Sequence, residues 1–193
     1  MSPKYRTYLI FGAPGSGKGT QGKTLGTIPR FFHCACGDVF RGLDLKSDLG
    51  KTFLEYSSKG ELVPDEFTVQ LWKGAIEGAV HAKRFNAEHD ILVLDGIPRN
   101  VHQAKIMADK INVKKLFHLT CPDRSLLMKR LKQRALKDNR LDDANEDTIH
   151  HRLEVYEKES RPVLDYYGKS IIAVIDASQS PVKILSNILK ELS

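Results

Sequence analysis

Short apolar runs alternate along the chain with longer stretches in which apolar residues recur at helical spacing. The segments between the runs are long enough to hold crossover helices. The alternation therefore predicts an α/β fold, a parallel sheet with helices on both faces, whose ligands bind at the carboxyl ends of the strands. The predicted strands lie near Thr7–Gly12, Phe31–Ala35, Ile91–Asp95, Lys115–Thr120 and Ser170–Asp176.

Glycine and proline residues divide the remaining stretches into predicted helices. The stretch from Asp44 to His81 reads as two helices that meet before Pro64, because proline cannot sit inside a helix. It stands outside the strand–helix alternation and predicts a small helical lobe beside the sheet. The other predicted helices cover Gly19 to about Gly26, the basic segment Asp123–Lys137, a long amphipathic stretch that must kink or restart at Arg161-Pro162, and a final segment from about Pro181.

Length, charge and cysteine content narrow the functional class. The 193 residues suit a single domain, and the net charge of +6 suits an anionic ligand, which nucleotides, nucleic acids and membranes all provide. No apolar run approaches the roughly 18 residues of a membrane span. The first apolar run is short and enters a glycine loop, which argues against a signal peptide. Three cysteines suggest reduced thiols, so we expect a cytoplasmic protein without a membrane partner.

The first predicted strand runs into a glycine-rich loop, GAPGSGKGT, at residues 12–20. A strand, a G-x-x-x-x-G-K loop and a helix together predict a phosphate-binding loop. Glycines let successive backbone N–H groups face one anion, and the helix adds the positive end of its dipole. Lys18 supplies a charge for the outer phosphates, and the Thr20 hydroxyl can reach a phosphate or its metal. The stricter motif has Ser or Thr where this chain has Gly19.

A second candidate site follows the most apolar predicted strand. Asp95 ends this strand, and beside a phosphate loop such an acid commonly holds a magnesium ion through water; the alternative is a capped turn. Arg99 follows a rigid Ile97-Pro98 turn, and arginine suits bidentate phosphate recognition. Gln103 lies one helical turn beyond Arg99, so both side chains can serve one ligand.

Arginines spread over four segments suggest two phosphate-bearing ligands that meet: Arg41, Arg99, Arg134, Arg140 and Arg152. Positioning and charge stabilisation by such groups are the main contributions of a protein to phosphoryl transfer. Taken alone, Arg41 reads equally well as a surface arginine on the first turns of a helix, just past a Gly37-Asp38 turn. Asp142 and Asp143 read equally well as caps of the following helix.

A metal site is the weaker interpretation of the next cluster. His33, Cys34 and Cys36 could be ligands, with His118 and Cys121 as distant partners. Their spacing matches no closed zinc pattern. Small residues in a half-buried strand are the simpler interpretation.

Taken together, these motifs resemble those of the adenylate kinases of the nucleoside monophosphate kinase family. The GKGT form of the phosphate loop is the one this family uses, which accounts for Gly19. The matching stretches occur in family order and span nearly the whole chain: GAPGSGKGTQ (12–21), GDVFR (37–41), GELVPDE (60–66), DGIPRNVHQ (95–103), RLDD (140–143) and HRLEVY (151–156).

The resemblance implies a P-loop NTPase-type three-layer fold with a five-stranded parallel sheet in one domain over residues 1–193. It also implies a monophosphate-binding lobe over about 36–65 and a short lid over about 138–145. The implied reaction transfers a phosphoryl group reversibly and directly from Mg·ATP to AMP, giving two ADP, in a monomer that binds no nucleic acid. The cofactor is Mg²⁺, with Asp95 near its waters, and no zinc is expected because the short lid contains no cysteine.

Site residues follow from the matching motifs. ATP is expected at Gly15, Ser16, Gly17, Lys18, Gly19, Thr20, Arg134 and Gln179. AMP is expected at Cys36, Arg41, Glu61, Leu62, Val63, Gly96, Arg99, Gln103, Arg140 and Arg152. The catalytic group is expected to be Lys18, Arg99, Arg134, Arg140 and Arg152, with His151 as an alternative register for the last.

Two departures keep alternatives open. Cys36 stands where adenylate kinases usually carry a threonine near the adenine, and a thiol is a weak donor. Asn100 stands where UMP/CMP-directed relatives also tend to have asparagine, so a UMP/CMP kinase of the same fold is the first alternative; Gln103 favours AMP. The second is a nucleotide-regulated protein that grips nucleic acid with the basic segment Arg124–Lys137, although that segment lacks interleaved aromatic residues.

Overall fold

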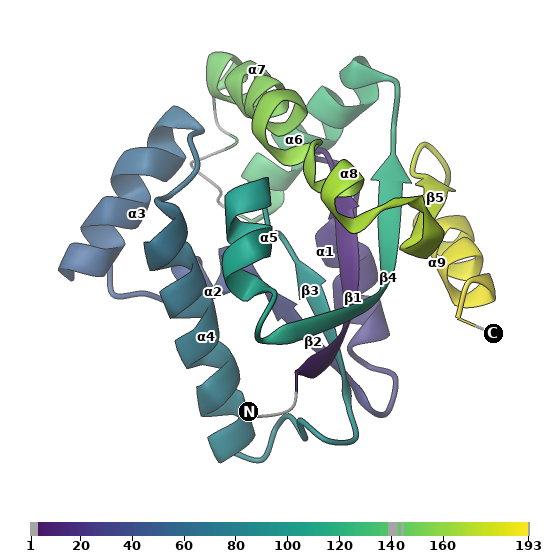
Figure 1. The fold of residues 1–193 in the computed structure, drawn as a ribbon. Helices are drawn as coiled ribbons and strands as arrows, with labels where there is room; N and C mark the ends of the chain where they lie inside the picture. The colour runs from purple at the N-terminus through teal and green to yellow at the C-terminus, as the bar shows by residue number, and fades with distance from the viewer. Residues whose placement is uncertain (1–3, 139–142, 144, 193) are drawn as a thin grey trace.

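The computed structural model describes residues 4–138, 143 and 145–192. In this part of the chain, five parallel strands form one sheet in the order β2-β3-β1-β4-β5 (Figure 1). The predicted α/β class and the five-stranded parallel sheet are therefore confirmed. The strands are β1 (Tyr5–Gly12), β2 (Phe31–Ala35), β3 (Ile91–Asp95), β4 (Ile111–Thr120) and β5 (Ile172–Asp176).

The predicted starts of three strands needed correction, and that of β1 is two residues too late, because β1 begins at Tyr5. β4 begins at Ile111, four residues before the predicted start, because its polar first half pairs with β1 from Tyr5 onward. β5 begins at Ile172, because residues 169–171 form a 3₁₀ turn before it. Backbone pairing does not require apolar side chains, so the hydrophobic pattern missed the start of β4.

Alternate side chains of the central strands enter two separate cores. Leu9 and Phe11 of β1 pack in the core beneath α4 (Asp65–His81), α5 (Val101–Met107) and α8 (Val163–Tyr167). Ile10 points to the other face and packs under α1 (Lys18–Leu25) and α9 (Pro181–Lys190). This period of two along a buried strand is what two helical layers require.

The predicted helix breaks lie where the sequence placed them. α3 (Asp48–Lys59) ends at Gly60, whose φ of +76° stops the helix, and α4 starts directly after Pro64. Likewise α7 (Glu146–Val155) continues as a π-helical turn, Tyr156–Ser160, and α8 restarts after Pro162. α6 (Arg124–Asp138) is the predicted basic helix.

The prediction for the segment after β2 was wrong. Gly37 and Asp38 form no turn but lie inside the short helix α2 (Cys36–Arg41), so Arg41 ends this helix and does not begin one. No helix within the described residues is both long and apolar enough to cross a membrane.

The strand order places a binding crevice at the end of β1. The chain passes from β1 to β2 and β3 on one side of the sheet and then crosses to β4 on the other side of β1. The loops after β1 and β4 therefore diverge and leave space at the carboxyl edge, where ligands bind in open α/β sheets. Ile10 of β1 pairs in register with Asp95 of β3, so the glycine loop and this carboxylate share that edge.

Candidate active site

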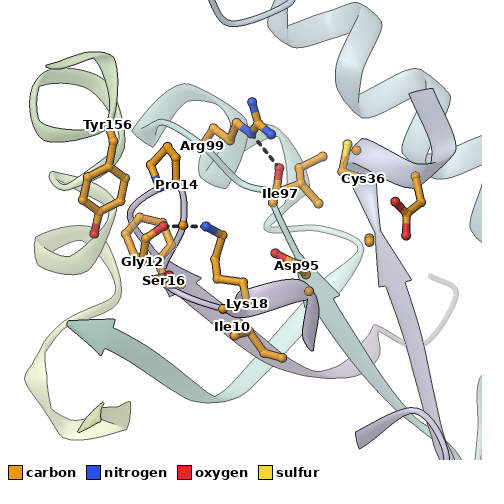
Figure 2. Close-up of a pocket in the computed structure, with 18 of the residues that line it drawn as sticks. Ile10, Gly12, Pro14, Ser16, Lys18, Cys36, Asp95, Ile97, Arg99 and Tyr156 are labelled. Carbon is orange, nitrogen blue, oxygen red and sulfur yellow. Dashed lines mark hydrogen bonds between the residues drawn. The ribbon is translucent and has the colours of Figure 1, made fainter. Parts of the chain in front are cut away.

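A cavity of about 800 Å³ opens at this edge of the sheet. Its wall includes the loop after β1, the helix α2, the turn before α4, and residues of α6 and α7. All of the site residues predicted from the sequence line this cavity, except Arg140, which lies outside the described residues. Figure 2 shows the side chains of Lys18, Asp95 and Arg99 directed into the same space.

The glycine loop has the tight backbone that the sequence predicted. Gly15 has a φ of +82°, and a Cβ atom there would lie 2.8 Å from the carbonyl oxygen of Leu127 on α6. The loop therefore lies too close to α6 for a side chain at this position. Ser16 Oγ is buried and makes no hydrogen bond within the described part of the chain. Such a hydroxyl, at the N-terminus of α1, fits a loop that binds an anion.

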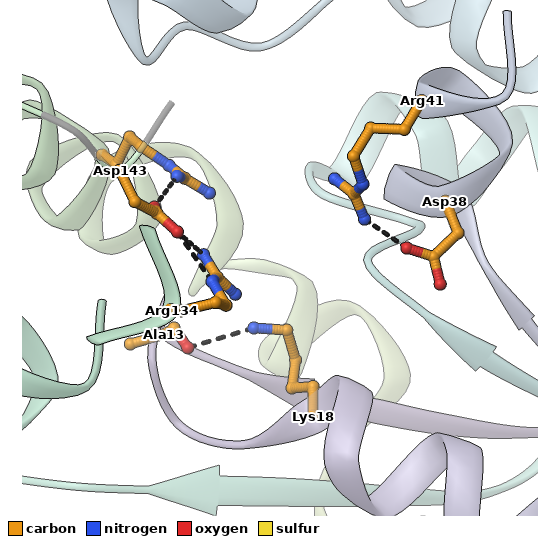
Figure 3. Close-up of polar contacts among 7 residues, drawn as sticks. Ala13, Lys18, Asp38, Arg41, Arg134 and Asp143 are labelled. Atoms are coloured by element: carbon orange, nitrogen blue, oxygen red, sulfur yellow. Dashed lines mark hydrogen bonds and ion pairs between the residues drawn. The ribbon is translucent and has the colours of Figure 1, made fainter. Parts of the chain in front are cut away.

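Lys18 reaches back over the loop that carries it. Its Nζ donates hydrogen bonds to the carbonyl oxygens of Gly12, at 2.7 Å, and of Ala13, at 3.0 Å (Figure 3). Burial lowers the pKa of Lys18 to about 8; Asp95 opposes this effect, and the neighbouring cations Arg99 and Arg134 add to it. Without a bound ligand, the charged form of the ammonium group is therefore less stable in the cleft than in water. The negative charge of a bound polyphosphate would stabilise it.

Asp95 and Arg99 lie at opposite ends of the turn after β3. Asp95 is buried, and its Oδ2 lies 4.0 Å from His33 Nε2. Arg99 donates from Nε to the carbonyl oxygen of Gly96 at 3.0 Å. Its main-chain N–H donates to Gln103 Oε1 at 2.7 Å. The side chain of Arg99 is thus held by a local hydrogen bond before any ligand binds.

A buried carboxylate joins two of the predicted catalytic arginines. Asp143 has no exposed side-chain surface, and its Oδ2 accepts from Arg134 Nε at 2.7 Å. Its Oδ1 accepts from Arg152 Nη1. The alternative interpretation, in which Asp143 caps the following helix, is wrong, because Asn145 caps α7. Arg152 lies in the cavity wall whereas His151 is exposed, so Arg152 is the residue that faces the site.

Two sides of the cleft therefore carry guanidinium groups. Figure 3 shows Arg134 and Asp143 on one side of Lys18, and Arg41 with its partner Asp38 on the other. This distribution of cations around one phosphate loop matches the pattern expected for two phosphorylated ligands that meet end to end.

Comparison with known protein families identifies the family to which this chain belongs. A family model described as adenylate kinase matches residues 10–172. The chain belongs to the adenylate kinase family. It is therefore a nucleoside monophosphate kinase, an enzyme that transfers a phosphoryl group from ATP to AMP to give ADP.

Curated relatives extend this match over nearly the whole chain. Adenylate kinase from Parabacteroides distasonis is 37% identical over 165 residues, which cover 82% of each protein. Adenylate kinase from Prochlorococcus marinus subsp. pastoris is 32% identical over 189 residues, 95% of each. Adenylate kinase from Corynebacterium urealyticum is 35% identical over 173 residues, 89% of this chain and 91% of the relative.

Two other residues predicted to contact nucleotides in this adenylate kinase, Cys36 and Gln179, have different surroundings. Cys36 is buried in the cavity wall, and burial raises the pKa of its thiol to about 12, so the group stays neutral. Gln179 Nε2 donates to Asp176 at 3.0 Å. Among the described residues, no three His, Cys, Asp or Glu side chains gather as metal ligands, so the weaker cluster interpretation around His33 finds no support.

Sequence reasoning missed two acids that organise the site. Asp143 and Asp65 each accept hydrogen bonds from side chains far away in the sequence or on another helix. Both lie inside motifs that carry the family resemblance, but the motifs give no hint of the partners. Either pairing can be recognised only from the packing of the helices in the folded structure.

Proposed function

We propose that the cleft binds Mg·ATP and AMP together and transfers the γ-phosphoryl group between them directly. An oxygen of the AMP phosphate attacks the γ-phosphorus in line, the bond to the β-phosphate oxygen breaks, and two ADP result. No covalent intermediate with the protein forms. The observation that carries this proposal is the convergence of Lys18, Arg99, Arg134 and Arg152 on one cavity next to a phosphate loop. In phosphoryl transfer the protein contributes positioning and charge stabilisation, and these groups supply both.

The ATP side is formed by the loop and the helices α1 and α6. Backbone N–H groups from Gly15 to Thr20 would surround the β- and γ-phosphates, and Lys18 would exchange its carbonyl partners for the outer phosphates. Arg134 enters from α6, and Gln179 also lines the cavity. Asp143 keeps Arg134 in place without touching the nucleotide.

The AMP side is formed by α2, the turn before α4 and the turn after β3. Arg41, Arg99 and Arg152 would bind the phosphate, with Arg140 from the lid. Arg41 is paired with Asp38 and would have to exchange this partner for the phosphate. The base would lie against Gly96, Gln103, Cys36 and the backbone of residues 61–63, which line that part of the cavity.

Magnesium fits the carboxylate at the end of β3. Mg²⁺ prefers oxygen ligands and usually keeps several waters beside one or two carboxylates and the substrate phosphates. Asp95 is buried and directed toward the first turn of α1, where a Cβ on Gly19 would lie 3.4 Å from its Oδ2. Asp95 would hold the ion through water, and the ion would neutralise charge on the phosphates.

Replacing Arg99 by alanine is expected to damage the use of AMP more than the use of ATP. The guanidinium is held by the carbonyl of Gly96 at the AMP end of the cavity, so its loss removes a fixed partner of the monophosphate. We expect KM for AMP to rise on the order of tenfold or more, with a smaller change in KM for ATP. Steady-state kinetics with each substrate varied in turn measures both.

Arg6→Ala is the matched control for that experiment. Arg6 also donates to backbone carbonyls, among them that of His89 at 2.7 Å, but it does not line the cavity. This variant should keep the KM for AMP. An Arg99→Ala enzyme with an unchanged dependence on AMP would refute the assigned role.

Preference for AMP over UMP or CMP remains a prediction. Asn100, one of the residues that raised the alternative, has a structural role in the fold. Its side chain caps α5 by accepting from the N–H of Gln103. The presence of asparagine at this position therefore has an explanation that does not involve the base.

Other properties of the proposal are also untested. A monomeric state, a cytoplasmic location, the need for magnesium without zinc, and the absence of nucleic-acid binding stay predictions. The basic helix α6 bears on the last of these. Arg130 donates to the carbonyl of Ala177, Lys132 pairs with Glu146, and Arg134 pairs with Asp143. Because these cations already have partners within the protein, structural and nucleotide-binding roles for α6 are favoured over nucleic-acid binding.

A further inference from the structure

The amide of Gln103 is held between two groups of opposite hydrogen-bonding character. Its Oε1 accepts from the main-chain N–H of Arg99 at 2.7 Å. Its Nε2 donates to Asp65 Oδ1 at 2.8 Å. The residue is only 1% exposed, yet it lines the cavity at the end assigned to the monophosphate.

Asp65 accepts hydrogen bonds from both Gln103 and Asn100. It lies in the first turn of α4 and accepts from Asn100 Nδ2, at 2.8 and 3.0 Å to its two oxygens. Asn100 in turn accepts from the N–H of Gln103 at 2.8 Å. Asp65 is not one of the residues that line the cavity, so it acts on the site only through Gln103 and Asn100.

These partners fix which way the amide of Gln103 faces. A main-chain N–H only donates, and a carboxylate only accepts. Turning the amide over would place the –NH₂ group against the Arg99 N–H and the carbonyl oxygen against the carboxylate. Both hydrogen bonds would be lost and replaced by repulsive pairs, so one orientation is strongly favoured.

A locked amide can discriminate bases that a free amide cannot. After its two protein contacts, Gln103 retains one N–H and one lone pair at fixed positions. Adenine presents an amino donor at position 6 and an acceptor at N1, whereas a 6-keto purine presents an acceptor and then a donor. A freely turning amide pairs with either pattern, but a locked amide pairs with only one of them.

We propose that Asp65 is a specificity-determining positioning residue, which locks Gln103 in the orientation that accepts a 6-amino purine and rejects a 6-keto purine. The inference rests on the proposed function, in which the monophosphate base lies against Gln103. Asp65 touches no substrate, and its effect on the base is transmitted through the amide.

The test compares AMP with IMP, two acceptors that differ only at position 6 and in the proton on N1. The variant Asp65→Ala removes the acceptor that holds Nε2, so only the main-chain N–H of Arg99 still favours the original orientation and the inverted amide becomes more accessible. We expect the ratio of kcat/KM for AMP to that for IMP to fall about tenfold or more. Most of that change should appear in KM for the monophosphate, because Asp65 does not touch the phosphates.

Glu66→Ala is the matched control. Glu66 joins the same two helices through a contact of 3.3 Å with His102, and this contact does not involve Gln103. The AMP-to-IMP ratio should stay at the wild-type value in this variant. If Asp65→Ala lowers kcat/KM for AMP and IMP equally, Asp65 has only a structural role and the proposal is overturned.

A second variant covers the case in which Asp65→Ala does not fold, as judged by circular dichroism. Asp65→Asn keeps the volume of the side chain and can donate to an inverted Gln103 as well as accept, so it should also lower the ratio; an unchanged ratio in this folded variant overturns the proposal. Wild-type protein that phosphorylates no nucleoside monophosphate would instead contradict the proposed function, and AMP and IMP binding by calorimetry then still measures the lock.

Discussion

Replacing Lys18 by methionine is expected to lower kcat by on the order of 10²–10³, which is the usual loss on removing one preorganised charge donor. Methionine keeps most of the length of the side chain and removes the ammonium group. The charge matters because a cation held beside the transferring phosphoryl group stabilises the negative charge on that group. Burial lowers the pKa of Lys18 to about 8, and a bound anion would favour the protonated form of this group.

Turnover with saturating Mg·ATP and AMP measures this loss. Lys73→Met is the matched control, because Lys73 lies on α4 with Glu77 as an exposed partner at 3.7 Å and is absent from the cavity wall. That variant should turn over like the wild type. A Lys18→Met enzyme with an unchanged kcat would remove Lys18 from the mechanism and with it the central role of the glycine loop.

Replacing Asp143 by asparagine is expected to impair both stability and catalysis. The buried carboxylate is the shared partner of Arg134 and Arg152, so the asparagine variant loses the negative charge that both guanidinium groups contact. Removing one partner of a buried ionic network costs on the order of 3–5 kcal/mol in unfolding free energy. The arginines keep 29% and 14% of their side-chain surface exposed, so we expect about 2–4 kcal/mol here.

A loss of turnover should accompany the loss of stability, because Arg134 and Arg152 are no longer held toward the phosphates. We expect kcat to fall on the order of tenfold or more at a temperature where the variant is folded. Urea unfolding and steady-state kinetics on the same preparation give the two numbers.

Glu146→Gln is the control for the same pair of helices. Lys132 and Glu146 also join α6 to α7, at 2.8 Å, but both side chains are more than half exposed. Exposed pairs contribute about 0–1 kcal/mol, so this variant should keep its stability and turnover. If the Asp143→Asn protein keeps the same stability and turnover as the Glu146→Gln protein, the buried ion pairs contribute to neither.

Local patterns predicted the parts of this molecule that depend on local physics. β3 lies at the predicted residues because four apolar residues in a row have few alternatives in a buried sheet, and β2 also lies at its predicted residues. The glycine loop was predictable because its chemistry needs particular residues at particular spacings. The break at Pro64 was predictable because proline has no N–H to continue the helix.

Side-chain partners across the fold were not predictable in the same way. Asp143 looked like a helix cap because asparagine and aspartate both serve as caps, and only the packed structure shows that Asn145 takes that place. Asp65 looked like an ordinary first-turn acid of α4. Its bonds to Asn100 and Gln103 depend on how α4 lies against α5, which no local pattern describes.

A coupled assay of ADP formation from Mg·ATP, with AMP, UMP, CMP, dAMP and GMP as acceptors in turn, tests the central claim most directly. We predict rapid turnover with AMP and a strong preference for AMP over UMP, CMP and GMP. Comparable or faster rates with UMP or CMP would contradict the assigned substrate while leaving the phosphate chemistry intact. No turnover with any acceptor would contradict phosphoryl transfer between nucleotides as the function of this cleft.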